Sequence, residues 1–154
     1  MTGAEDFQVL SRLGSGSFGT VYKVHRHADG QEYVIKEIRI AELTSKEQLS
    51  AVNEVKLLAK IKSPFVVKYY DYFIDREALH IVMEFCNKGD LSRLIKRSLL
   101  KPRGDCPGLK YDVIWPIILQ IILGLHYLHS EKILHRDLKR FAVKRFSLYF
   151  LKYH

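Results

Sequence analysis

Cysteine is scarce in this chain, and no stretch has the composition of a linker. The only two cysteines, Cys86 and Cys106, form no C-x-x-C pair and no metal-type spacing. We therefore expect free thiols in a reducing compartment. No Pro/Gly/Ser-rich tract or repeat divides the 154 residues, which favours one domain or part of a larger one. The polar start, Met1 to Asp6, is unlike a signal peptide, so we expect a cytoplasmic location.

A long hydrophobic run is also missing. The most apolar stretch, Val113 to Leu128, is shorter than the ~20 residues that a bilayer span needs, and it contains Pro116, Gln120 and His126. We interpret it as a helix buried in the protein and not as a membrane span.

The basic charge is concentrated at one end of the chain. The formal net charge is +8, and the five Lys/Arg from Lys139 onward, with no Asp or Glu among them, supply +5 of it. A basic tail can bind nucleic acid or acidic lipid. This one has no nucleic-acid-binding motif, so no specific nucleic-acid partner is predicted.

Turn signals and β-branched residues predict five strands, with one helix inserted after the third. A glycine-rich turn separates the first two strands, and Asp29-Gly30 is a hairpin signal before the third. Consecutive antiparallel strands need no crossover helices, so the fold class is α+β. The predicted strands are 7–13, 20–24, 32–38, 66–73 and 79–85.

The inserted helix is predicted from Ser45 to Ile61. Thr44 and Glu47 have the spacing of a capping box at its start. At 100° per residue, Glu54 falls at the edge of the inward apolar face. A carboxylate in that position needs a partner, because burying it unpaired is costly.

Two further helices are expected after the strands. Asp90 can cap a short helix through Leu99, and 101–110 reads as a loop. Asp112 can cap a long apolar helix ending at Ser130. Pro116 is then expected in that helix's first turn, where an amide has no intrahelical partner.

The motif Gly14-x-Gly16-x-x-Gly19-x-Val21 has three interpretations. It is a dinucleotide fingerprint, a phosphate loop of the kinase type, or a flexible hairpin. The dinucleotide fingerprint must open a helix, whereas this motif runs into a strand. The kinase arrangement, a glycine-rich hairpin over phosphates, is favoured.

Lys36 follows on the third strand, in Val34-Ile35-Lys36. A lone lysine here is ordinarily a solvated strand residue. Together with the inward Glu54 it predicts an ion pair in which Lys36 holds the α- and β-phosphates while Glu54 orients its ammonium.

His135-Arg136-Asp137-Leu138-Lys139 matches the H-R-D-L catalytic loop of kinases and directly follows the long helix. Asp137 would accept or orient the proton of a substrate hydroxyl. Lys139 would neutralise charge on the transferred phosphoryl group. We expect His135 to be a packed residue and not an acid or base.

Residues 6–139 together resemble a protein kinase, with the N-terminal lobe and hinge at 7–86 and the start of the C-terminal lobe at 87–139. The runs 81–86 and 65–71 are similar to those of NIMA-related (NEK) serine/threonine kinases. The resemblance implies that Met83 is the gatekeeper, that ATP is the nucleotide and that proteins are the substrates. It also makes a nuclear or cytoskeletal location an alternative. The implied ATP-binding residues are Leu13, Gly14, Ser15, Gly16, Ser17, Phe18, Gly19, Val21, Val34, Lys36, Glu84 and Cys86, with backbone groups of the last two at the adenine edge.

The match ends after Lys139. Kinases place a magnesium-binding Asn five residues after the catalytic Asp, and here that position is Ala142. The D-F-G aspartate falls at or past the last residue, so no metal ligand is assigned, although the family uses Mg²⁺. We expect a C-terminally truncated kinase domain (1–139) with a divergent basic tail (140–154), arising from a splice variant, a shifted reading frame or divergence. The expected function is a serine/threonine kinase by family that is inactive in this form. The alternative is a catalytically dead module that binds partners, and the apolar helix is expected to dock on a chaperone or partner.

Overall fold

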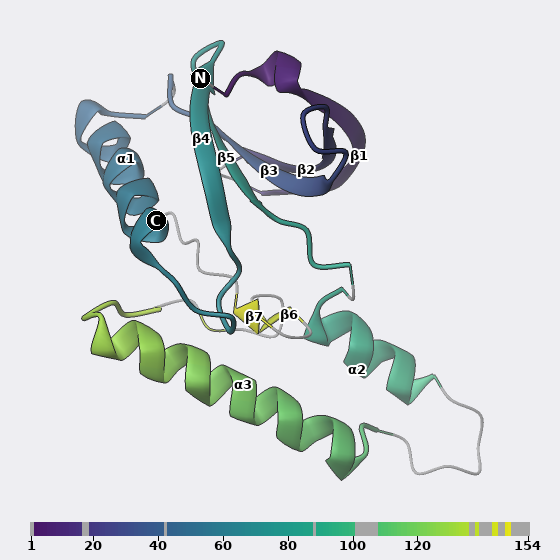
Figure 1. Cartoon of the computed structure of the whole chain (residues 1–154). Helices are drawn as coiled ribbons and strands as arrows, with labels where there is room; N and C mark the ends of the chain where they lie inside the picture. The colour runs from purple at the N-terminus through teal and green to yellow at the C-terminus, as the bar shows by residue number, and fades with distance from the viewer. Residues whose placement is uncertain are drawn as a thin grey trace. The chain divides into compact units, whose positions relative to one another are not determined.

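The computed structural model describes residues 2–16, 19–41, 43–87, 89–100, 108–135, 138, 143–144 and 147–148. The chain forms two compact units (Figure 1). The first consists of Met1–Ile61 and Lys68–Phe85, and the second mainly of Lys62–Val67 and Cys86–Lys152.

The first unit is built on a five-stranded sheet in the order β1-β2-β3-β5-β4. Every neighbouring pair is antiparallel, which confirms the predicted α+β class and the number of strands. A short 3-10 turn, η1 (Ala4–Asp6), precedes the sheet. The strands are β1 (Phe7–Gly16), β2 (Gly19–Arg26), β3 (Glu32–Arg39), β4 (Tyr69–Asp75) and β5 (Ala78–Glu84).

The fourth strand begins later than predicted, at Tyr69 instead of Val66. The Val66 N–H donates to the Ser63 carbonyl at 3.3 Å, so the chain turns there. Val66 and Val67 are buried. Their β-branched, apolar side chains gave a strand-like pattern because they pack in the interior and not because they pair in the sheet.

Helix α1 (Ser45–Lys60) begins with the predicted capping box. The Thr44 N–H donates to the Glu47 carboxylate at 2.8 Å, and the Glu47 N–H donates to the Thr44 hydroxyl at 3.4 Å. The helix lies beside β4 (Figure 1). Its buried side chains are Ala51, Val55 and Leu58.

The two faces of the sheet pack separately. One face carries an aromatic cluster in which the Phe7 and Phe73 rings stack at 6.0 Å and the Phe7 and Tyr33 rings meet edge to face at 6.5 Å. Successive strand residues point to opposite faces, so Val34 and Lys36 lie on the other side from Tyr33. The complete cluster is Phe7, Val24, Tyr33, Ile35, Phe73 and Val82.

The second unit contains α2 (Leu91–Leu99) and α3 (Tyr111–Ser130). The Asp90 carboxylate accepts a hydrogen bond from the Arg93 N–H at 2.8 Å, so the predicted cap of α2 is confirmed. The Lys62 N–H donates to the Tyr127 hydroxyl at 2.8 Å. That bond ties the segment before β4 to α3.

Helix α3 begins at Tyr111, with Lys110 at the N-cap position, so the predicted start at Asp112 is wrong. Asp112 lies within the first turn and makes no capping bond there. Pro116 therefore stands inside the helix, past the first turn. Its missing N–H leaves the Asp112 carbonyl without its intrahelical donor.

The prediction that α3 is buried is also wrong. Among the residues of α3 only Gly124 and Leu128 are buried, while Trp115 is 64% exposed and Ile122 is 55% exposed. The helix has 20 residues, more than the sequence predicted. It is long and apolar enough to cross a membrane by length and composition.

A small hairpin of β6 (Val143–Lys144) and β7 (Ser147–Leu148) lies within the basic tail. It is the one pair of strands in the described residues that the sequence pattern did not predict.

Candidate nucleotide-binding site

The glycine-rich motif includes the end of β1, at Gly16, and the start of β2, at Gly19. Gly14 pairs with Val21, and Gly16 pairs with Gly19, across the two strands. The motif therefore leads from strand to strand, which excludes the dinucleotide interpretation and agrees with a glycine-rich hairpin. Ser15 pairs with Thr20, whereas Ser17 and Phe18 lie outside the described residues.

Two glycines of this motif differ in how much space surrounds them. Gly19 has φ +141°, and a Cβ there would lie 1.8 Å from the Glu37 carbonyl oxygen of β3. No side chain fits so close to a backbone, so Gly19 is needed for β2 and β3 to pair. A Cβ at Gly14 would meet nothing within 4 Å. Glycine at 14 is therefore not needed for packing in the described residues and leaves open space above the sheet.

The sheet register collects four predicted site residues on one face. Val21 pairs with Lys36, and Val34 pairs with Met83. Directly paired residues share a face, as do residues two apart in a strand. Val21, Val34, Lys36 and Met83 thus form one continuous surface, which we call the lysine face.

Two other residues assigned to the site lie at its margins. Leu13 falls at an irregularity of β1, between Arg12 and Gly14, and is 50% exposed. The Glu84 N–H already donates to the Lys68 carbonyl at 2.9 Å. The Cys86 carbonyl, in the second unit, accepts from the Gly89 N–H at 3.3 Å.

Several predicted residues fall where the structure gives no description. Asp137 and Lys139 lie outside the described residues, and so does the side chain of Glu54. The ion pair between Lys36 and Glu54 and the two catalytic roles therefore stay predictions. His135 is 5% exposed, as expected of a packed residue.

Tyr69 belongs to the lysine face, although sequence reasoning did not assign it there. It pairs with Met83 across β4 and β5, next to a register shift between Tyr69 and Asp71. Burial raises the pKa of the Tyr69 hydroxyl to about 12, so the ring is neutral at physiological pH. The only sequence signal was an aromatic strand position, because a register shift is not visible in a pattern of apolar residues.

An electrostatic cluster of Arg26, Asp29 and Tyr33 lies on the opposite face. Asp29 accepts hydrogen bonds from the Arg26 guanidinium and from the Tyr33 hydroxyl, the latter at 2.7 Å. These bonds, the Arg26 bond first, hold the pKa of the Asp29 carboxyl well below its usual range. The cluster fixes the β2–β3 turn and contributes nothing to the lysine face.

The residues present do not fit a magnesium site of the kinase type. The position that supplies an Asn ligand is Ala142, which has no donor atom. Among the residues that the structure describes, no group of three His, Cys, Asp or Glu side chains could hold a metal ion. The lysine face offers apolar side chains beside two lysines, of which Lys23 pairs with Val34 and forms an ion pair with Glu32. These residue types suit a nucleotide.

A glycine-rich hairpin and a lysine on the third strand of a five-stranded antiparallel sheet are the parts of a nucleotide-binding kinase lobe. Residues 7–142 match the protein kinase domain family, and the chain belongs to that family.

Within this family the similar proteins include NEK kinases. The chain is 43% identical over 140 residues to "Probable serine/threonine-protein kinase nek2" of Dictyostelium discoideum. It is 38% identical over 142 residues to "Serine/threonine-protein kinase Nek2" of Mus musculus and 38% identical over 135 residues to mouse "Serine/threonine-protein kinase Nek1". Each match covers 88% of this chain but only 32%, 31% and 11% of the respective relative. The chain thus spans about a third of the Nek2 relatives and less of Nek1.

Proposed function

We propose that this chain binds ATP against the lysine face. The observation that carries the proposal is the sheet register, which puts Val21, Val34, Lys36 and Met83 on one surface. Small-molecule sites are mostly apolar with a few placed polar groups. Val21, Val34 and Met83 would contact the adenine, and the Lys36 ammonium would bind the phosphates.

The reaction class of the family is transfer of the γ-phosphoryl group to a serine or threonine hydroxyl. The hydroxyl oxygen forms a bond to the γ-phosphorus, the bond to the β–γ bridging oxygen breaks, and ADP leaves. Asp137 would take the hydroxyl proton and Lys139 would neutralise the transferring group. Mg²⁺, when bound, neutralises phosphate charge in this family.

For the chain as it stands we propose nucleotide binding with negligible transfer. Ala142 removes one ligand of the ion that neutralises the developing charge, and the protein supplies little covalent chemistry of its own. Loss of one electrostatic group costs about 10²–10³ in rate in other enzymes.

Nucleotide binding is tested by titrating the 154-residue chain with ATP in a calorimeter. We expect saturable binding that Lys36→Ala weakens at least tenfold and that Lys56→Ala, an exposed lysine on α1, leaves unchanged. Equal affinity in the Lys36→Ala variant would overturn the proposal. Transfer is tested separately with γ-labelled ATP, where we expect no more product than with Asp137→Ala.

A second candidate function is partner binding without catalysis. The observation that favours it is the exposed apolar side of α3, with Tyr111, Trp115, Leu119 and Ile122 each more than half exposed. Their spacing puts them along one stripe of the helix. In sedimentation velocity we expect self-association that Trp115→Lys reduces. A compact monomer at all concentrations would contradict this candidate.

A further inference from the structure

A cavity lies on the face of the sheet opposite the lysine face. Its volume is about 680 Å³, within the range of roughly 300–1,000 Å³ that is usual for ligand pockets. It lies entirely within the first unit, because every lining residue belongs to η1, to the five strands or to the turns next to them.

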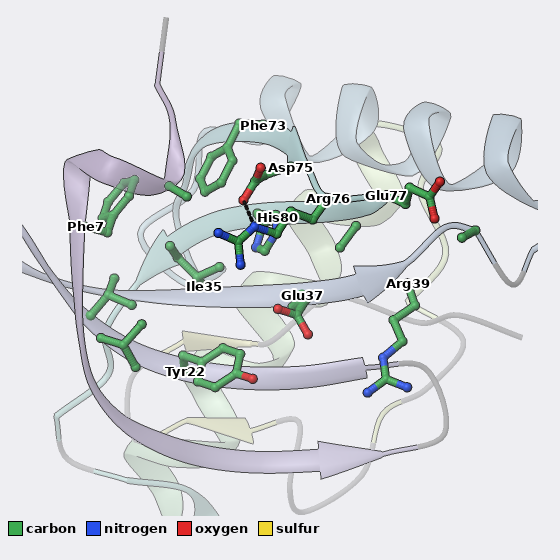
Figure 2. A pocket seen from close by; sticks show the side chains of 15 residues that line it. Phe7, Tyr22, Ile35, Glu37, Arg39, Phe73, Asp75, Arg76, Glu77 and His80 are labelled. Atoms are coloured by element: carbon green, nitrogen blue, oxygen red, sulfur yellow. Dashed lines mark ion pairs between the residues drawn. The ribbon is translucent and has the colours of Figure 1, made fainter.

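One end of this cavity is apolar (Figure 2). The Phe7 and Phe73 rings and the Ile35 side chain form its floor over the aromatic cluster. Val9, which is 61% exposed, extends the same surface towards solvent. An apolar side chain placed there would bury surface against rigid, well-packed rings, which is the geometry of an interface anchor.

The other end is charged and carries three carboxylates, from Glu37, Asp75 and Glu77 (Figure 2). The Arg76 guanidinium pairs with the Asp75 carboxylate at 3.9 Å, and Arg39 is not without an interaction partner. Within the described residues, the Glu37 carboxylate makes no hydrogen bond or ion pair. Glu37 is only partly exposed, and a carboxylate withdrawn from water gains from a cationic partner.

His80 joins the two ends of the cavity. It pairs with Glu37 across β3 and β5, and its ring stacks on Phe73 at 4.7 Å. The unpaired carboxylate is therefore one strand away from the aromatic floor. A ligand that meets both must carry a cation next to an apolar group.

We propose that this cavity binds a peptide segment of a partner protein in which a basic residue adjoins an aromatic residue. The aromatic ring lies on Phe7, Phe73 and Ile35, and the basic side chain pairs with Glu37. Charge complementarity favours this occupant. Within the residues that the structure describes, the Glu37 and Glu77 carboxylates form no ion pair with a cation, whereas Arg76 pairs with Asp75. The proposal does not depend on ATP binding, because the cavity and the lysine face are on opposite sides of the sheet.

The probe is the synthetic peptide acetyl-Ser-Gly-Phe-Arg-Gly-Ser-amide, titrated into the full chain labelled at isoleucine and valine methyl groups. We expect saturable shifts of the Ile35 and Val24 methyl signals. A peptide with Ala for Phe and one with Glu for Arg should each bind at least fivefold more weakly. Equal or tighter binding of the Glu peptide would overturn the proposal, because Arg39 and Arg76 would then attract the ligand in place of Glu37.

Two variants of the chain test the two ends of the cavity, one variant for each end. Glu37→Gln keeps the shape but removes the charge, and it should weaken the Phe-Arg peptide about fivefold. Glu131→Gln, an exposed carboxylate beyond α3, is the matched control and should change nothing. Val9→Ser should weaken binding without touching the buried core, and the circular dichroism of each variant reports its folding.

The remaining outcomes also decide the proposal. Unchanged affinity in both Glu37→Gln and Val9→Ser would place the peptide elsewhere. Shifts of Ile35 and Val24 that depend on chain concentration without any peptide would assign the cavity to another copy, whose residues 140–154 are rich in basic and aromatic residues. Either result overturns the proposal of a separate partner.

Discussion

The two faces of the sheet are built by the same strands but present different chemistry. The lysine face carries two lysines among apolar side chains, with Lys23 and Met83 beside Val34 and with Val21 and Ile81 beside Lys36. The opposite face carries stacked aromatic rings, and its polar groups are carboxylates, arginines and an imidazole. Since side chains alternate along β3, one residue of shift would exchange the two sets. Under the two proposals above, the register therefore decides which face binds a nucleotide and which binds a cationic peptide.

A substitution at Ile81, which is fully buried, tests the packing on the lysine face. Ile81→Ala leaves a cavity beneath Lys36 and should lower the free energy of unfolding by about 3 kcal/mol. Urea unfolding followed by far-UV circular dichroism measures it. Ile74→Ala, on the same face but 56% exposed, is the control and should cost about 0.5 kcal/mol. Equal losses in the two variants would contradict the assignment of Ile81 to the core.

A substitution at Gly19 tests the close contact between β2 and β3. Gly19→Ala puts a Cβ against the Glu37 carbonyl at a φ that favours glycine, and we expect a loss of about 2 kcal/mol. Gly14→Ala has open space and should leave unfolding within about 0.5 kcal/mol of the parent chain. If ATP lies under the hairpin, Gly14→Ala instead weakens ATP binding. The same urea titration, repeated with ATP, separates the two effects.

The turn between β4 and β5, which lines the cavity on the opposite face, can be tested by replacing its two central residues. Arg76 and Glu77 have φ of +45° and +61°, a conformation that Asn-Gly adopts readily in tight hairpins. Replacing the pair by Asn-Gly should stabilise the chain by about 1 kcal/mol. Replacing it by Ala-Ala should give no gain, because alanine also disfavours positive φ. Thermal unfolding that ranks the two double variants the other way round would contradict the turn geometry.

The smallest expected effect is the pH dependence of the Arg26–Asp29–Tyr33 cluster on the opposite face. The folded pKa of Asp29 lies below its ordinary value of 3.8. A depressed carboxyl pKa stabilises the folded state above pH 3.8, and that contribution is lost as the pH falls through the folded pKa. Asp29→Asn should therefore be less stable than the parent at pH 7, with a difference that shrinks below pH 3.8. A constant difference at all pH values would show that the charge of Asp29 is not involved.

Much of this comparison could be predicted from local sequence. The capping box at Thr44 and Glu47 and the cap at Asp90 depend on contacts between residues three apart, and both are present. The five strands are also present, and their sequence signals were local turn and β-branched residues. The assignment of Val34 and Lys36 to one face needed only the alternation of a strand.

The predictions that failed depended on tertiary packing. Val66 and Val67 are buried outside the sheet, and burial produces the same residue preferences as a strand. Helix α3 begins at Tyr111, before the acidic residue that resembled its cap. The cavity opposite the lysine face could not be predicted at all, since residues from five strands and their turns line it.

The central claim is that ATP binds the lysine face, and methyl signals test it directly. Met1 and Met83 are the only methionines, so the Met83 methyl group is readily assigned. On addition of ATP, we predict shifts at Val21, Val34 and Met83 while Val24, Ile35 and Val82 stay unchanged. Shifts confined to Val24, Ile35 and Val82, or none at saturating ATP, would contradict the account.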